Sequence, residues 1–187
     1  MRHRLLFSGL LVAATGAMAC GDDEVPPQQA VFWLGLSSTA QAQCSANRNF
    51  TLPADARTTI TGDGQGDRVK DGQDVMGSDA LVECTVKETP KGSGSYNVDL
   101  SLSVGEIGNF SADGVLTGPM GTSGTVDVNF NTAQFQLEQD NCTADIEQII
   151  GGAIWLQNLH CSNMRDPSSP GVSCDALGGV IFENCAR

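Results

Sequence analysis

The residues best suited to metal chemistry lie in one acidic segment, DGQGDRVKDGQD, which runs from position 63 to position 74. Asp63, Asp67, Asp71 and Asp74 stand at positions 1, 5, 9 and 12 of this segment. Calcium prefers oxygen ligands that a flexible loop can gather around it. The segment is therefore a candidate calcium site, but its glycine-rich composition is more typical of a solvated surface loop.

The same segment resembles the acidic calcium repeats of thrombospondin type 3 modules and, more distantly, the loop of an EF-hand. The resemblance implies that the four aspartates act as calcium ligands. The sequence departs from these loops at Gln65, at Arg68 and at Asp74, where a further oxygen ligand, a glycine and a glutamate are expected, respectively. Lys70 adds a second positive charge to the loop.

Groups suited to acid–base catalysis are few in this chain. His160 is the only histidine outside the first 19 residues, so any Ser-His-Asp or Cys-His mechanism would depend on it. Neither a G-x-S-x-G elbow nor an H-E-x-x-H pair occurs. Four carboxylates near expected strand ends could form a hydrolytic pair, namely Glu106, Asp113, Glu138 and Asp140. Because the sequence does not fix their separation, we predict a protein that is not an enzyme.

Aromatic side chains that could stack on a sugar ring are also scarce. Trp33, Trp155 and Tyr96 are the only Trp and Tyr residues of the chain. Both tryptophans lie within apolar runs, which predicts that they are buried in the core.

The N-terminus has the features of a secretion signal. Basic residues at positions 2–4 precede an uncharged, apolar run from position 5 to position 19, which is too short to span a membrane as a helix. The run ends in Ala17-Met18-Ala19-Cys20 and resembles a bacterial lipoprotein signal. The resemblance implies that residues 1–19 are removed and that Cys20 carries acyl chains such as palmitate, which anchor the protein to a membrane. Plain secretion after ordinary cleavage is the alternative.

The cysteine count agrees with lipid on Cys20, because an odd count in an exported chain needs an explanation. Setting Cys20 aside leaves six cysteines that can pair in an oxidising compartment, namely Cys44, Cys84, Cys142, Cys161, Cys174 and Cys185. Sequence spacing leaves their connectivity open. Cys161 and Cys174 flank a polar loop, so the preferred scheme joins these two, Cys44 with Cys84, and Cys142 with Cys185.

The rest of the chain divides into a tether and one domain. Residues 20–30 hold the lipidated cysteine and an acidic, proline-containing segment typical of a flexible tether. Residues 31–187 have the size of a single domain. Once Arg2 and Arg4 leave with the signal, eight Lys and Arg residues remain against 22 Asp and Glu, a formal charge of −14. So acidic a chain is a poor partner for nucleic acid.

Hydrophobic periodicity after the tether predicts β-strands. The segment from Tyr96 to Val104 alternates apolar and polar residues, as a half-buried strand does. Glycine, proline and asparagine clusters such as 90–94 separate such runs and predict hairpin turns. We therefore expect an all-β fold, an antiparallel β-sandwich or small barrel stabilised by disulfides. A short helix is expected over 143–150, with Thr143 as its cap.

These features predict a lipid-anchored protein of the cell envelope that acts as a non-enzymatic structural or interaction module. The outer membrane is favoured over the inner membrane because Gly21, rather than an aspartate, directly follows Cys20. The expected partners are the membrane, through the lipid, and an envelope protein; no cofactor other than calcium is indicated. The alternative is a calcium- or carbohydrate-binding module that uses the acidic loop 63–74. The molecular function and oligomeric state stay open at this point.

Overall fold

The structure is a computed structural model that describes residues 25–38, 44, 48–62, 66–105, 107–117, 122–134, 136–150, 152–169 and 171–187. Its elements are β1 (Gln29–Ser37), β2 (Asn49–Leu52), α1 (Ala56–Thr61), β3 (Val69–Lys70), β4 (Asp74–Val75), β5 (Ser78–Asp79), β6 (Leu81–Glu88), β7 (Ser95–Val104), β8 (Gly108–Thr117), β9 (Thr122–Asn131), β10 (Gln136–Ile150), β11 (Ala153–Arg165) and β12 (Ser173–Glu183). Cys20 and residues 21–24 of the predicted tether lie outside the described residues. The predicted tether extends too far, because Gln29 and Ala30 belong to β1 and Ala30 is buried.

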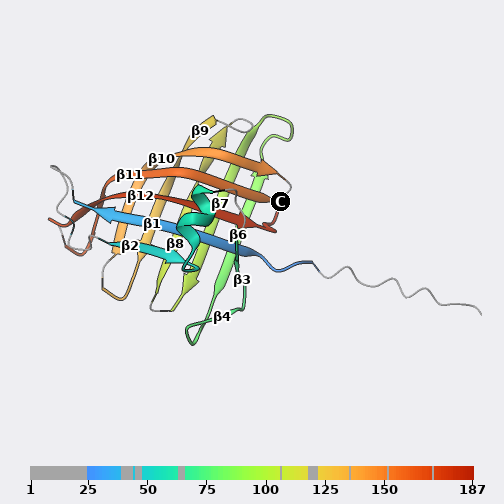
Figure 1. Cartoon of the computed structure of the whole chain (residues 1–187). Coiled ribbons are helices and arrows are strands. Elements are labelled where there is room, and N and C mark those ends of the chain that lie inside the picture. The colour runs from blue at the N-terminus through green and yellow to red at the C-terminus, as the bar shows by residue number, and fades with distance from the viewer. Residues whose placement is uncertain are drawn as a thin grey trace, which may run out of the picture.

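Within the described part of the chain, ten strands form one antiparallel sheet in the order β2-β1-β12-β11-β10-β9-β8-β7-β6, with β3 also paired to β1. Consecutive strands from β6 to β12 are neighbours, whereas β1 joins the sheet beside the C-terminal strand β12. The sheet curls over itself, so β10, β11, β12 and β1 cross in front of β6 to β9 (Figure 1). The predicted all-β antiparallel fold is confirmed.

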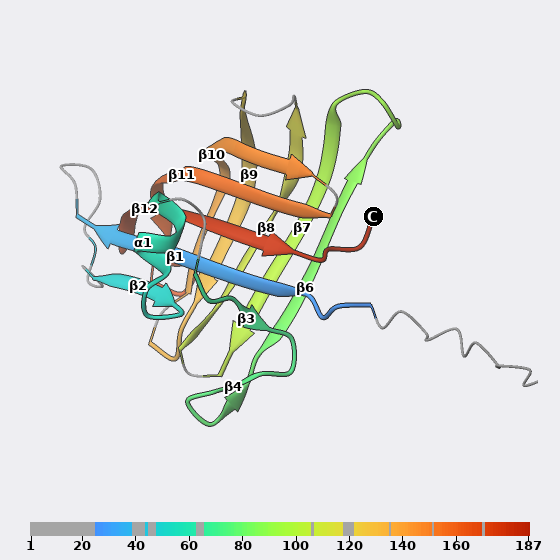
Figure 2. The same ribbon diagram turned by 45° about the vertical axis from the view of Figure 1, so that its right-hand side comes forward.

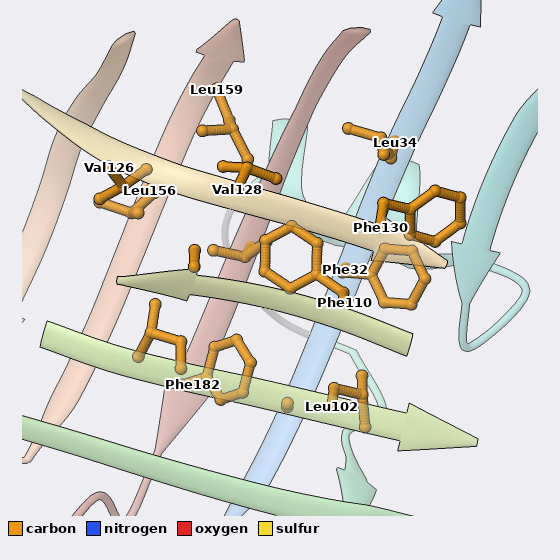
Figure 3. Packing of buried hydrophobic residues seen from close by; sticks show 14 of the residues in the cluster. Phe32, Leu34, Leu102, Phe110, Val126, Val128, Phe130, Leu156, Leu159 and Phe182 are labelled. Carbon is orange, nitrogen blue, oxygen red and sulfur yellow. The ribbon is translucent and has the colours of Figure 1, made fainter. Parts of the chain in front are cut away.

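Apolar side chains from both layers of the curled sheet meet in one core. Phe32 of β1 stacks on Phe110 of β8 with ring centroids 5.7 Å apart and lies 6.0 Å from the ring of Phe130 on β9. Figure 3 shows these three rings between the crossing strands. Leu100 and Leu102 are fully buried on β7, as the alternation of that segment predicted. Contacts between the layers therefore hold the two halves of the sheet together.

The helix expected over 143–150 is not formed, because this segment is the C-terminal half of β10. Cys142, Ala144 and Ile146 are buried and the residues between them are exposed, which is a period of two. Strand β10 pairs with β9 on one side and β11 on the other. Pairing on both edges and the β-branched isoleucines favour a strand over an isolated helical turn.

The predicted disulfide bonds are present, but the predicted pairing is wrong. The bonds among the described cysteines are Cys44–Cys174, Cys84–Cys185 and Cys142–Cys161. Sheet topology explains each bond better than sequence spacing does. Cys142 and Cys161 lie on the neighbouring strands β10 and β11. Cys84 bonds to Cys185 because the curl of the sheet brings the C-terminal segment to β6. Cys44 bonds to Cys174 because β1 ends beside the start of β12.

Helix α1 covers the outer face of the sheet over β1 and β12, as Figure 2 shows. Its residue Ile60 packs with Val31, Trp33 and Ile181, which form a small apolar cluster separate from the main core. A side chain at Gly179 would collide with Ile60, so the glycine makes room for the helix. Trp33 is 8% exposed and is buried as predicted, although it lies beneath α1 and not between the layers. Trp155, for which burial was also predicted, is only half-buried against the same cluster.

The curled sheet is closed by side chains and by the C-terminal segment, and not by continuous strand pairing. At the free edge of β6, Val82 N–H donates to Asp71 Oδ1 at 3.0 Å and Cys84 N–H donates to Gln28 Oε1 at 2.7 Å. Val86 N–H donates to the carbonyl of Ala186 at 2.9 Å. These bonds satisfy donors that an open edge strand would expose.

We expect Asp71→Ala to lower the free energy of unfolding by about 1–2 kcal/mol, because the Val82 N–H would lose its acceptor at the edge of β6. Urea denaturation measures the loss, and hydrogen exchange of the Val82 amide should become faster. The exposed Asp79 provides a matched control, since Asp79→Ala should change the stability by less than about 0.5 kcal/mol. Equal losses in the two variants would refute the role of Asp71 at this edge.

Candidate functional site

A cavity of about 700 Å³ lies where β1, β3 and the segment before β3 meet, and we call it the base cavity. Its lining residues are Pro27, Gln29, Gly66, Asp67, Arg68, Lys70, Asp71 and Gln73. Strand β3 is part of the acidic segment 63–74. It pairs with β1 through Val69 opposite Ala30 and Lys70 opposite Gln29. The cavity thus joins the segment singled out by the sequence to the point where the chain enters the domain.

Glu183 organises one wall of the base cavity. Its Oε2 atom accepts a hydrogen bond from Gln29 Nε2 at 2.7 Å and lies 3.4 Å from Arg68 Nε. The guanidinium of Arg68 also donates to the carbonyl of Gly66 at 2.9 Å. Because the Arg68 side chain is only 10% exposed, these contacts hold its positive charge in a fixed position beside the cavity.

The base cavity presents both kinds of hydrogen-bonding group. Asp67 and Asp71 offer carboxylate oxygens, Gln29 and Gln73 offer amides, and Lys70 adds a cation to that of Arg68. Such a mixture of donors and acceptors suits the hydroxyl groups of a polyol. For a divalent cation, the carboxylates of Asp67 and Asp71 would supply oxygen ligands, whereas the nearby positive charges weaken the attraction.

The structure brings two of the four predicted calcium ligands to one cavity. Asp67 and Asp71 line the base cavity, whereas Asp74 accepts the Gly77 N–H at 3.3 Å in the turn between β4 and β5. Asp63 lies outside the described residues. In the described part of the chain, no group of three or more His, Cys, Asp or Glu side chains is arranged to hold a metal ion. Calcium binding by this loop stays a prediction.

His160 lies in a polar hollow on the outer face of β10, β11 and β12. Its Nε2 atom is 3.6 Å from Asp175 Oδ2 and 3.5 Å from Ser162 Oγ. A catalytic triad needs the acid on one ring nitrogen and the nucleophile on the other. Here both partners face the same nitrogen, so the histidine cannot take a proton from Ser162 while Asp175 orients its opposite side.

Of the four carboxylates expected at strand ends, Asp113 lies on β8, and Glu138 and Asp140 lie on β10. Asp113 lies in the middle of β8, where it stands opposite Asp99 of β7 and Asp127 of β9. Glu138 is opposite Asn129, further along the sheet. Glu106 lies outside the described residues. The row of three aspartates was not predicted, because only the register of the three strands places them side by side.

Another carboxylate, Asp166, serves the turn between β11 and β12. Its Oδ1 atom accepts hydrogen bonds from Ser168 Oγ at 2.6 Å and from the Ser168 N–H at 2.8 Å. The hydroxyl of Ser168 and, to a lesser degree, the nearby backbone amides lower the pKa of Asp166 below its usual value. The carboxylate therefore stays ionised and shapes the turn.

Comparison with known proteins gives no relative: no protein-family model, no curated protein and no solved structure matches the chain. Among the described residues, no helix is long and apolar enough to cross a membrane. The fold and its cavities define the class of this protein as a disulfide-stabilised domain built on one curled antiparallel sheet.

Proposed function

We propose that this protein is a lipid-anchored module of the bacterial cell envelope, exported by its leader and attached to the membrane through Cys20. Its β domain acts as a non-enzymatic structural or interaction module. The outer membrane is the proposed location, because Gly21 follows the lipidated cysteine.

The observation that best supports this proposal is the way in which the described end of the tether is fixed to the domain. Gln28 forms two hydrogen bonds with the backbone of Cys84, one at its N–H and one at its carbonyl. Asn184 Nδ2 donates to the carbonyl of Pro27 at 2.8 Å. The chain therefore enters the domain at a defined point, which is what a displayed module requires of its attachment.

Because the chain enters at the start of β1, the two ends of the domain differ in their distance from the tether. Strand β1 starts at Gln29, opposite Glu183, and ends at Ser37, opposite Asp175. An anchor attached through the tether would hold the first of these ends toward the membrane. The opposite end, at which β1 ends and β12 begins, would then face away from it, where a partner in the envelope can reach it (Figure 2).

Two further observations support the remaining parts of the proposal. The three disulfides fit an oxidising compartment outside the cytoplasm. The geometry at His160 favours a module without catalytic activity, because one ring nitrogen faces both of its polar neighbours.

Calcium binding is a second candidate function, favoured by the presence of Asp67 and Asp71 in one cavity. A calcium-dependent rise in melting temperature that Asp71→Ala abolishes and Asp79→Ala keeps would support it.

The anchor is tested by Cys20→Ala, expressed in a Gram-negative host and followed by membrane fractionation. We expect the unaltered protein in the outer-membrane fraction, with an N-terminal mass increased by acyl chains, and Cys20→Ala in the soluble periplasmic fraction. Val25→Ala is the matched control, because Val25 is 83% exposed in the same tether and should leave the location unchanged. A soluble, unmodified protein that begins at Cys20 would overturn the lipid anchor but not export.

A further inference from the structure

Another cavity, of about 570 Å³, lies between the β6–β7 hairpin, the turn that joins β10 to β11 and the C-terminal residues. We call it the basic hollow. Its lining residues are Val86, Lys87, Glu88, Lys91, Tyr96, Ile149, Gly152 and Arg187. Cys185 N–H donates to the carbonyl of Gly152 at 2.7 Å, and Ala186 pairs with β6, so the C-terminal segment forms a fixed wall. The volume is in the range of small-molecule sites.

The charge of this hollow is opposite to that of the chain. Only eight Lys and Arg residues follow position 19, against 22 acidic residues. Lys87, Lys91 and Arg187 are three of these eight, and all three line the hollow. A cluster of cations in so acidic a protein creates a local positive potential that attracts a small anion.

The carboxylate among the described lining residues already has a structural task. Glu88 Oε1 accepts the Gly94 N–H at 2.8 Å within the β6–β7 hairpin. Hydrogen bonds from the backbone amides of Gly92 and Gly94 and, to a smaller degree, the positive charge of Lys91 lower the pKa of Glu88 below its usual value. Its charge is thus held toward the hairpin amides, and the cations outnumber it.

The floor of the hollow is apolar. Val86 is buried, and Ile149 and Tyr96 are half-buried and pack against the main core. Val86 and Tyr96 lie on the inner face of β6 and β7, where they continue the alternation of the core residues toward the end of the sheet. A ligand in this place would contact hydrocarbon below and positive charge at the rim.

We propose that the basic hollow binds a small amphiphilic anion, with a carboxylate head held by Lys91 and Arg187 and an apolar body against Val86, Ile149 and Tyr96. The apolar floor disfavours a simple inorganic anion, which needs hydrogen-bond donors on several sides. The cations disfavour a neutral lipid, because covering charged groups with hydrocarbon costs free energy. A large polyanion is disfavoured by the acidic charge of the rest of the chain. This inference does not depend on the lipid anchor.

The test is isothermal titration of decanoate into the full exported chain that carries Cys20→Ala, so that no detergent competes for the site. Adding Lys91→Gln and Arg187→Gln should weaken decanoate binding by at least about tenfold, because two charge-assisted contacts are lost. The control adds Arg57→Gln and Arg165→Gln, which remove the same charge elsewhere and should change the affinity by less than about twofold. The charge-retaining pair Lys91→Arg and Arg187→Lys should keep binding.

Two further ligands decide the chemistry of the site. Decanol has the same apolar chain without the charge and should bind at least about tenfold more weakly than decanoate. Inorganic phosphate that bound as tightly as decanoate would reduce the hollow to a simple anion site and overturn the amphiphilic assignment. No binding of decanoate, or an equal loss in the Arg57 and Arg165 control, would overturn the proposal, with melting curves showing that each variant is folded.

Discussion

Replacing Cys84 and Cys185 together by alanine is expected to lower the free energy of unfolding by about 4–5 kcal/mol. This bond joins residues 101 positions apart and therefore restricts the unfolded chain strongly. It also fixes the C-terminal segment to β6, where Ala186 accepts the Val86 N–H and donates to the Cys84 carbonyl. Urea denaturation under non-reducing conditions measures the change in stability.

The control for this variant is removal of the Cys142–Cys161 bond, which joins residues only 19 positions apart on neighbouring strands. Its loss should cost about 3 kcal/mol, because a shorter loop is closed. Hydrogen exchange of the Val86 amide should increase in the first variant and stay low in the control. A smaller stability loss for Cys84 and Cys185 than for the control would contradict the long-range closure, as would a non-reducing peptide map that pairs Cys44 with Cys84.

Local patterns in the sequence were sufficient to predict the strands but not the way in which they assemble. The alternation from Tyr96 to Val104 predicted β7, since the period of two reflects the two faces of one strand. The turn at 90–94 was also predicted correctly, because glycine and proline mark it locally. The helix expected over 143–150 failed because its isoleucines and the glycines after it fit a helix end and a strand end equally well. Pairing with β9 and β11 decides between them.

Disulfide pairing was beyond the sequence for a related reason. The bonded partners Cys44 and Cys174 are 130 positions apart, and only the pairing of β1 with β12 brings their neighbourhoods together. The predicted scheme favoured cysteines that are close in sequence. One observed bond, Cys142–Cys161, does join nearby cysteines, but the scheme had not paired these two. Contacts made by the curl of the sheet leave no local mark on the residues involved.

The candidate site was predicted in part. The segment 63–74 was singled out for its aspartates, and Asp67 and Asp71 do line the base cavity. Gln29, which lines the cavity, and Glu183, which holds Gln29 in place, could not be foreseen, because they come from strands at opposite ends of the chain. Asp71 also shows that a residue chosen for metal chemistry can serve the fold, since its Oδ1 atom accepts a backbone N–H at the sheet edge.

Three of the many acidic residues of the chain, Asp99, Asp113 and Asp127, lie side by side on β7, β8 and β9. Like charges directly opposite one another on neighbouring strands are destabilising. Asp127 offsets part of this cost by accepting the Asn141 N–H at 2.8 Å. The stability that tolerates such a row must come from elsewhere in the molecule, which makes the disulfides and the aromatic contacts between the two layers the main candidates.

Phe32→Ala is therefore expected to lower the free energy of unfolding by about 3–5 kcal/mol. Phe32 is fully buried, and its ring contacts both Phe110 and Phe130 on the opposite layer (Figure 3). Truncation would leave a cavity at the point where the two layers meet, and the rigid strands around it cannot close the gap. Thermal and urea denaturation measure the loss.

Val115→Ala on β8 provides the control for this variant, because Val115 is also an apolar strand residue but is 55% exposed on the outer face. It should change the stability by less than about 0.5 kcal/mol. If the two substitutions cost the same, the contact of β1 with β8 and β9 would not be what holds the curled sheet together. A large loss confined to Phe32→Ala, with the disulfides intact, would show that aromatic packing between the layers stabilises the fold independently of its covalent links.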